Sequence, residues 1–410
     1  MIGRTAAAWL VVLACAGPDV SPPITPVAPQ VDEPQVSEAT QDEDDHGADD
    51  HGADDHGASP AEAAESLAPA LAIAPIVAPP EPGQGDEVWL KGSTHVHAHA
   101  SGDSSEPNAR VIAWYTDRHY DFIVLTDHNR VSELEPASHT QGQVALRDPG
   151  AGLIVLSGIE LTHNPVGCLP VGDPSRNCRI HVNLLGPTAR PLGRIEWAER
   201  HSHARLDMYR AALTAQATLG GLAQVNHPQW LWGMTPDLLV ELSRRGVRLV
   251  EIANTAFSKW NAGDAGHPST EALWDAALGR GATLWGVASD DAHDYDGHGK
   301  YPPGGGWVVV RARRAPAAIL EALAVGHFYS SNGVVLARAD TEADELVVAV
   351  DPAATGSYTI DFIANGQHVA RVRAKTARHR IPSVGYLRAV VTRGDGKRAW
   401  VQPVRLSVRP

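Results

Sequence analysis

Two histidines at the end of an apolar run are the first residues of this chain whose types and spacing favour metal chemistry. His95 and His97 follow Val88-Trp-Leu90, a stretch that predicts a buried strand opening into a loop. Side chains alternate along a strand, so both imidazoles share one face. Imidazole nitrogens are common ligands of divalent metals, although an isolated pair of this kind also fits a solvated strand end.

The same pairing of an apolar run with a His, Asp or Glu recurs along the chain. Each such residue alone also fits a turn, a cap or a hydrogen-bonded core position. Residues that follow parallel strands meet at one edge of the sheet, so their joint placement predicts one polynuclear metal centre. The candidate ligands by this placement are His95, His97, Asp103, Asp127, His128, Glu160, His163, His181, His227, Asp290, Asp291 and His293.

The elements that must position these residues are apolar runs alternating with helix signals. Apolar runs occupy residues 121–126, 153–157, 180–185, 222–226, 247–252 and 282–287. Helix candidates occupy residues 108–118, 194–218, 236–245, 270–279 and 316–325. Several of these helices begin near Ser, Thr or Pro and end in Gly. Near-continuous apolar strands separated by helices predict a covered parallel sheet, and hence an α/β barrel.

The C-terminal segment has a different pattern. Short alternating runs separated by Gly-rich turns occupy residues 345–350, 358–364, 368–372, 386–392 and 399–404. This spacing predicts that residues 335–410 form a small antiparallel β domain packed against the barrel, without chemistry of its own.

The N-terminus predicts export. Arg4 and the apolar stretch 6–14 resemble a signal sequence that is too short to span a bilayer, and Val12-Leu-Ala-Cys15 resembles a bacterial lipobox. We expect residues 1–15 to be a lipoprotein signal peptide, so that the mature protein is anchored by a lipid and faces the periplasm or the cell exterior. Ordinary cleaved secretion and a cytosolic N-terminus are the alternatives.

Residues 16–86 have the composition of a disordered linker, because they are rich in Pro, Ala and acids and nearly lack aromatic residues. The sequence Asp-Asp-His-Gly-Ala occurs three times, beginning at residues 44, 49 and 54. These units are either part of a solvated tether or weak collectors of Zn²⁺ or Ni²⁺.

Charge separates this linker from the rest of the chain. The whole chain has a net charge of −14, and residues 5–90 hold 17 acids and no Lys or Arg. The remainder is therefore nearly neutral and has no basic tract, which argues against nucleic acid as a partner. The other cysteines, Cys168 and Cys178, predict either a disulfide at the rim of the site or a thiol pair for metal.

In their order along the chain, these motifs resemble those of the polymerase and histidinol phosphatase (PHP) family. The matching motifs are His95-x-His97 with Asp103, Thr126-Asp-His128, Gly158-Ile-Glu160 with a later His181, and Asp291-Ala-His293. The resemblance covers roughly residues 88–333 and implies a distorted (β/α)7 barrel over residues 87–334. It also implies two or three divalent ions, which we expect to be Zn, Mn or Fe.

The resemblance implies how the ligands are shared. His95, His97, Glu160 and Asp291 would hold one ion; Glu160 would bridge to a second ion held with His181 and His227; Asp103, His128 and His293 would hold a third. The chain departs from the family pattern in two places. Ser101-Gly-Asp103 is one residue longer than the common form, and a second acid, Asp290, precedes Asp291.

The end of the predicted barrel resembles one branch of the family. Gly306-Trp-Val-Val-Val310 and residues 326–333 look like the branch that includes carbamate-ester hydrolases. The implied function is a metal-dependent phosphoesterase acting on a small-molecule phosphoester. A carbamate, ester or amide hydrolase is the alternative, and a non-catalytic metal-binding surface lipoprotein is a third. The oligomeric state is not predictable.

Several polar residues are candidates for catalysis beside the metals. Glu160 is expected to bridge two ions, and Asp290, His163 and Lys300 are candidates to bind or protonate the substrate, with Arg130 and His298 as weaker ones. All of these also fit exposed loop positions without a role. Three aromatic residues in late loops form either an apolar wall of the site or part of the core: Trp230, Trp232 and Trp260.

Overall fold

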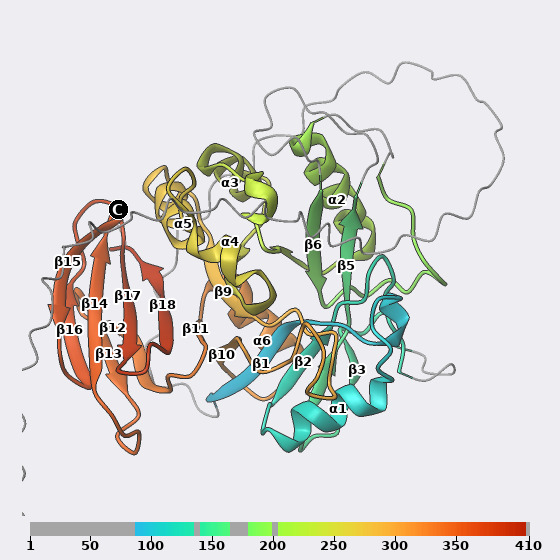
Figure 1. Ribbon diagram of the computed structural model, residues 1–410, viewed down its shortest axis with the longest axis horizontal. Coiled ribbons are helices and arrows are strands. Elements are labelled where there is room, and N and C mark those ends of the chain that lie inside the picture. The colour runs from blue at the N-terminus through green and yellow to red at the C-terminus, as the bar shows by residue number, and fades with distance from the viewer. Residues whose placement is uncertain (1–86, 135–139, 165–178, 199–203, 407–410) are drawn as a thin grey trace, which may run out of the picture. The chain divides into compact units, whose positions relative to one another are not determined.

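The computed structural model describes residues 87–134, 140–164, 179–198 and 204–406 (Figure 1). The predicted signal peptide, the acidic linker with its repeats, and the cysteines Cys168 and Cys178 lie outside the described residues. Within the described part, no helix combines the length and apolarity that crossing a bilayer requires.

The described strands of this mixed α/β protein form three sheets. The ten-stranded sheet has the order β15-β14-β17-β18-β11-β10-β1-β2-β4-β3. Its strands are β1 (Val88–Val96), β2 (Phe122–Leu125), β3 (Ala145–Arg147), β4 (Ile154–Leu156), β10 (Trp307–Ala312), β11 (Phe328–Ser331), β14 (Tyr358–Ala364), β15 (Gln367–Val372), β17 (Leu387–Arg393) and β18 (Arg398–Val404). The five-stranded sheet comprises β5 (Gly158–His163), β6 (Ile180–Leu185), β7 (Leu222–Val225), β8 (Leu249–Asn254) and β9 (Trp285–Ser289). The smallest sheet comprises β12 (Leu336–Glu342), β13 (Glu345–Val350) and β16 (Thr376–Arg380).

Strand direction departs from the parallel sheet that the sequence predicts. The pairs β1–β2, β2–β4, β7–β8 and β8–β9 are parallel. The pairs β5–β6, β6–β7 and β1–β10 are antiparallel. Composition could not reveal this difference, because a strand buried on both faces is apolar in either direction.

The two larger sheets meet at the residues that matter for the site. Among the described residues no continuous ladder closes them into one barrel; isolated bridges join Val96 to Ala292 and His128 to Glu160. Backbone hydrogen bonds reinforce both contacts, from the His97 N–H to the Ala292 carbonyl at 3.0 Å and from the Glu160 N–H to the Asp127 carbonyl at 3.1 Å. Each of these two bridges therefore involves a predicted ligand or its neighbour.

Helices cover the strands, and two of them begin at the capping residues that the sequence predicts. They are α1 (Asn108–Asp117), α2 (Arg205–Leu219), α3 (Pro236–Arg244), α4 (Ser258–Ala262), α5 (Thr270–Gly279) and α6 (Pro316–Val325), with short 3₁₀ turns η1 (His99–Ser101), η2 (Trp230–Trp232) and η3 (Thr255–Phe257). The Thr235 and Ser269 hydroxyls accept hydrogen bonds from N–H groups in the first turns of α3 and α5. The helix expected from residue 194 begins only at Arg205, because residues 194–198 are irregular.

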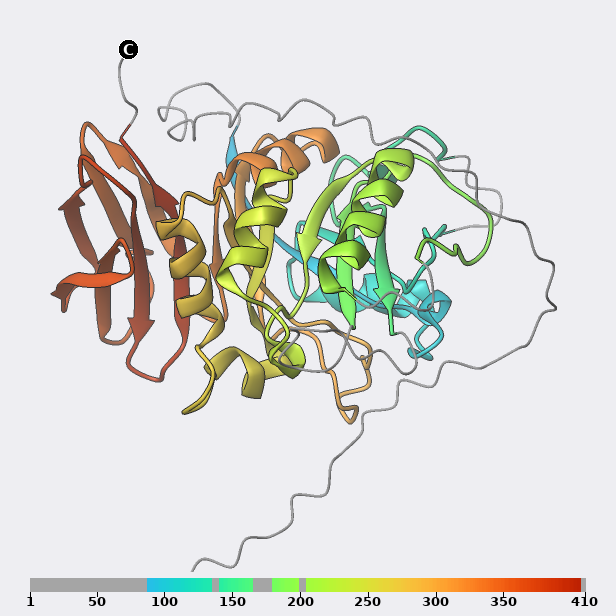
Figure 2. The same cartoon turned by 90° about the horizontal axis from the view of Figure 1, so that it is seen from above.

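A large core fixes the strands of the five-stranded sheet. Met208 of α2, Leu239 of α3 and Trp274 of α5 are buried against β6, β7 and β8, and each is 1% exposed or less. Figures 1 and 2 both show these helices along that sheet, with α5 on the side of the C-terminal strands. Close packing of this kind holds the strand ends, and the polar residues on them, in one arrangement.

The C-terminal strands are antiparallel, as predicted, but they do not form an isolated sheet. β18 pairs with β11, so β14, β15, β17 and β18 extend the ten-stranded sheet. The three-stranded sheet packs over this extension through a core that includes Leu346, Phe362 and Val391. A domain boundary at residues 334–335 stays a prediction, since hydrogen bonds between strands cross it.

A buried ionic network attaches this C-terminal layer to α5. Arg388 on β17 donates two hydrogen bonds to Asp275, at 2.7 and 2.6 Å, and the Tyr386 hydroxyl donates to the same carboxylate at 2.7 Å. Arg398 on β18 pairs with Glu271 one helical turn earlier. The Arg388 side chain is only 2% exposed, so its charge depends on these partners.

Replacing Arg388 should therefore destabilise the fold strongly. Arg388→Met leaves the largely buried Asp275 carboxylate without its cation, and we expect the free energy of unfolding to fall by about 3 kcal/mol or more in urea titrations. The matched control is Arg378→Met, which removes a surface pair with Glu345 and should change little. Equal losses in the two variants would show that the network does not attach the layer.

Candidate metal centre

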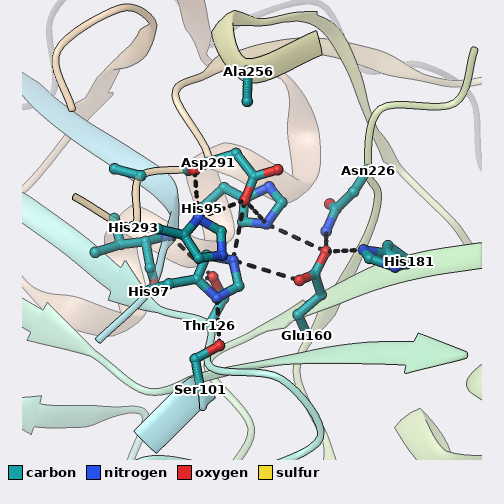
Figure 3. A network of polar contacts seen from close by, with 12 residues as sticks. His95, His97, Ser101, Thr126, Glu160, His181, Asn226, Ala256, Asp291 and His293 are labelled. Carbon is teal, nitrogen blue, oxygen red and sulfur yellow. Dashed lines mark hydrogen bonds and ion pairs between the residues drawn. The ribbon is translucent and has the colours of Figure 1, made fainter. Parts of the chain in front are cut away.

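All nine predicted ligands meet at one place, and Figure 3 labels His95, His97, Glu160, His181, Asp291 and His293 among them. His95 and His97 come from β1, Glu160 from β5 and His181 from β6. The loops after η1, β2, β7 and β9 supply the others, namely Asp103, His128, His227, Asp291 and His293. The structure thus brings together residues that lie far apart in the sequence.

The deepest part of this site pairs two imidazoles with two carboxylates. Asp291 Oδ1 lies 3.0 Å from His95 Nε2 and 3.1 Å from His97 Nε2. Glu160 approaches the same two nitrogens, at 3.3 Å and 3.5 Å. Both imidazoles are fully buried, so no solvent can take the place of these contacts.

Glu160 also faces the neighbouring imidazoles. Its Oε2 lies 2.8 Å from His128 Nδ1, and its Oε1 lies 3.0 Å from His181 Nδ1 and 3.8 Å from His227 Nε2. The sequence suggested a loop position for Glu160, whereas it lies within β5. One carboxylate therefore touches imidazoles from four chain segments, which is the position that a bridging ligand needs.

A third group lies nearer to solvent. Asp103 Oδ2 is 2.8 Å from His128 Nε2 and 3.2 Å from His293 Nε2, and the His293 ring stacks on His97 with centroids 4.0 Å apart. The Asp103 side chain is 21% exposed and that of His128 is 11% exposed, against 7% or less for the other seven. Access to the site is therefore from this side.

Three overlapping sets of these residues have ligand atoms within 4.8 Å of one another: His97, Asp103, His128 and His293; His95, His97 and Glu160; and His128, Glu160 and His181. Among the nine ligands, four have a buried Nε2 that makes no hydrogen bond within the described part of the chain, those of His95, His97, His181 and His227; the carboxylate oxygens near His95 and His97 are ion-pair contacts. Buried polar atoms without partners are costly unless a cation completes them. The donor set of imidazole nitrogens and carboxylate oxygens suits first-row divalent ions, so these residues fit a metal centre.

Strained backbone accompanies the site. Asp291 has φ 51° and Asn129 has φ 52°, left-handed values that are uncommon for residues other than glycine, and His227 has φ 23°. All three lie at or just after strand ends. Such strain persists where the surroundings impose it, and it is enriched at functional sites.

Several residues that support the ligands were missed by the sequence analysis. Asn226 donates to Glu160 Oε1 at 2.7 Å, Asn254 donates to Asp291 Oδ2 at 3.3 Å, and Ser101 Oγ lies 2.9 Å from His97 Nδ1. The available signal for Asn226 was its place directly before His227. A further buried carboxylate, Glu251, was also missed, although it is the one acid in the apolar run 247–252.

The predicted catalytic residues other than Glu160 lie around the cluster. The oxygens of Asp290 accept hydrogen bonds from Ser93 Oγ at 3.0 Å and the Gly304 N–H at 2.6 Å, which ties down the loop before β10. His163 lies three residues after Glu160 on β5 and so points to the opposite face, against Trp197.

The remaining candidates are exposed. Lys300 lies over the Tyr301 ring, 5.2 Å from its centroid, and Tyr301 in turn contacts the His293 ring at 5.5 Å. Arg130 and His298 are exposed loop residues. Catalytic roles for Asp290, His163 and Lys300 stay predictions.

Aromatic rings form one wall of the site. Trp230 lies edge-on to His181 and His227, with centroids 5.2 and 5.3 Å apart, and Phe257 stacks on His227 at 4.0 Å. We call Trp230 and Phe257 the aromatic wall. Trp232 and Trp260 instead contact each other, and Trp232 stacks on His267.

Burial and neighbouring charges divide the imidazoles into two kinds. Burial lowers the pKa of His97 to about 3, with help from His293, and lowers that of His181 to about 4 despite Glu160. Burial also opposes the charge on His128, but Glu160 and Asp103 outweigh it and raise the pKa to about 10.

Burial and neighbouring charges also oppose each other at His95, at His293 and at the carboxylates of the site. Carboxylates likewise raise the pKa values of His95 and His293 against the effect of burial. The imidazoles in turn lower the pKa values of three carboxylates against the effect of burial, those of Asp103, Glu160 and Asp291.

Neither a protein-family model nor a curated protein matches the chain.

Protonation offers a direct check on this charge balance. In metal-stripped protein at pH 8, ¹⁵N chemical shifts should show His128 protonated on both ring nitrogens, because its pKa is near 10, and His97 and His181 neutral. In the metal-stripped protein, the contribution of His128 to the free energy of unfolding should be fully present below pH 6.5 and should be lost as the pH rises through 10. A neutral His128 beside a charged His97 would contradict the balance.

Proposed function

We propose that the chain is a PHP-type metal-dependent hydrolase that acts on small phosphoesters. The convergence of nine imidazole and carboxylate side chains, four of them with buried nitrogens that lack hydrogen-bond partners in the described structure, carries this proposal. The isolated bridges support the barrel part of it. They connect β1 and β2 to the two ends of the five-stranded sheet, and we propose that these seven strands are a distorted (β/α)7 barrel.

The residues present fit two or three ions. We propose His95, His97, Glu160 and Asp291 for one ion, Glu160, His181 and His227 for the second, and Asp103, His128 and His293 for the third. Divalent ions held there would supply Lewis acidity and lower the pKa of water. Asn226 and Asn254 hold the Glu160 and Asp291 carboxylates in orientation by hydrogen bonds to one oxygen of each.

The chain's own residues also define how a substrate approaches. The exposed side of the cluster is the Asp103 and His128 side, so a substrate enters there. The aromatic wall lies beside His181 and His227. We propose that the wall receives the apolar part of the ester.

The aromatic wall is also compatible with a second candidate function that uses the same metal chemistry. A carbamate, ester or amide hydrolase would use the same centre, and Trp230 and Phe257 suit an apolar group on such a substrate as well as they suit a phosphoester. We also propose, from residues 1–15, that the protein is exported and anchored by a lipid. If it turns over no substrate, the remaining function is that of a non-catalytic metal-binding lipoprotein.

Hydrolysis assays separate these functions. Protein loaded with Mn²⁺ or Zn²⁺ should turn over p-nitrophenyl phosphate or bis-p-nitrophenyl phosphate, whereas preference for a naphthyl carbamate would favour the second candidate. Asp291→Asn should lower kcat/KM by more than about 100-fold, because residues that only orient metal ligands already contribute about 10- to 100-fold.

The matched control is Glu241→Gln, whose side chain pairs with Arg245 at the surface of α3. It should leave turnover unchanged. A metal-loaded protein that is inert towards all three substrates would contradict the hydrolase proposal and favour the metal-binding protein.

The aromatic wall gives a separate expectation. Trp230→Ala should raise KM for naphthyl or nitrophenyl substrates by about fivefold relative to an alkyl ester of the same acid, since a ring contact contributes about 1 kcal/mol. Trp260→Ala removes a ring that contacts Trp232 and should leave the ratio unchanged. Equal effects on aryl and alkyl substrates would mean that the wall does not contact the leaving group.

A further inference from the structure

The geometry points to Glu251 as the positioning residue that decides which ring nitrogen of His95 faces the metal site. Glu251 lies on β8 and is completely buried, with Oε1 2.8 Å from His95 Nδ1. This inference rests on the proposed metal centre, but it concerns the orientation of a ligand and not the reaction.

The hydrogen bonds of Glu251 leave it no capacity to act as a ligand itself. Besides His95, its Oε1 accepts from Ser289 Oγ at 2.6 Å and from Gln224 Nε2 at 3.3 Å. Its Oε2 accepts from the His227 N–H at 2.7 Å and from Asn254 Nδ2 at 2.9 Å. A carboxylate has about four acceptor positions, so these five donors saturate it.

An acceptor at this position determines the tautomer of His95. Because the ionised carboxylate has no proton to give, the Nδ1 of His95 must carry the hydrogen, and the lone pair is left on Nε2. That nitrogen points to Asp291 Oδ1 at 3.0 Å and to Glu160 Oε1 at 3.3 Å. Carboxylates behind a metal-ligating histidine hold the ring in this way and increase its basicity.

The other imidazoles are supported differently. The Nδ1 of His97 faces the Ser101 hydroxyl, that of His293 faces the backbone carbonyl of Asp291, and that of His181 faces Glu160, which belongs to the cluster. Among the described contacts, His95 is thus the ligand whose second nitrogen meets a carboxylate outside the proposed ligand set.

The same carboxylate also connects three ligand-bearing segments. It holds the backbone of His227, which has φ 23°, and it receives Asn254, which donates to Asp291 as well. Ser289 lies two residues before Asp291. A purely structural role in joining these strands is therefore the alternative to be excluded.

Zinc-loaded protein tests the inference without any substrate. Long-range ¹H–¹⁵N spectra of the wild type should show His95 protonated at Nδ1 and bound through Nε2. In Glu251→Gln, the amide cannot accept from His95 while also accepting from the His227 N–H and Asn254. We expect zinc affinity, measured by competition with a chelator, to fall about 10- to 100-fold.

Ser289→Ala is the matched control for a structural role. It removes another hydrogen bond to Glu251 Oε1 but leaves the contact with His95, so zinc affinity and the His95 tautomer should stay as in the wild type. Equal losses of affinity in Ser289→Ala and Glu251→Gln would overturn the positioning role in favour of the structural one.

The wild-type spectrum decides the question even if Glu251→Gln does not fold. A His95 proton on Nε2 in the zinc-loaded protein, or a wild type that binds no zinc at this cluster, would overturn the inference. If the tautomer and the affinities behave as expected while all ester substrates remain intact, the hydrolase proposal fails and the role of Glu251 stands.

Discussion

The constraint on which this structure depends is the burial of carboxylates that must remain charged. Glu160 and Asp291 are at most 5% exposed, and removing an ionised carboxylate from water is unfavourable unless opposite charge and hydrogen bonds surround it. Imidazoles from the ends of several strands provide that surrounding. Without metal they do so by holding protons, and divalent ions would take over the same role. The fold thus surrounds a set of buried carboxylates, and their burial is favourable only when positive charges lie beside them.

The scaffold explains how so many segments reach one point. The isolated bridges His128–Glu160 and Val96–Ala292 join the two larger sheets at the cluster. Helices α2, α3 and α5 pack against the five-stranded sheet, and the C-terminal strands extend the other sheet behind it. Gln402 of β18 even donates to the backbone of Gly286 on β9, the strand that leads to Asp291. The C-terminal layer therefore supports the site although it contributes no ligand.

The ligands could be predicted from the sequence because each lies close to the start or end of an apolar run. This local pattern is the same whether the strands are parallel or antiparallel. The pairing of β5 with β6 could not be predicted. The position of Glu160 within a strand was therefore missed, and so was the direction of His163, which points to the opposite face of β5, against Trp197. Glu251 escaped notice for a similar reason. Its role depends on five hydrogen bonds, four of which come from residues far away in the sequence, and no local pattern encodes contacts of that kind.

Anomalous diffraction tests the central claim most directly. Crystals of protein purified without chelators, measured on both sides of the Zn, Mn and Fe absorption edges, should show two or three peaks of metal density within bonding distance of His95, Glu160 and Asp291 and their neighbours. Ordered side chains in the same arrangement with only water between them, in protein exposed to these metals, would contradict it.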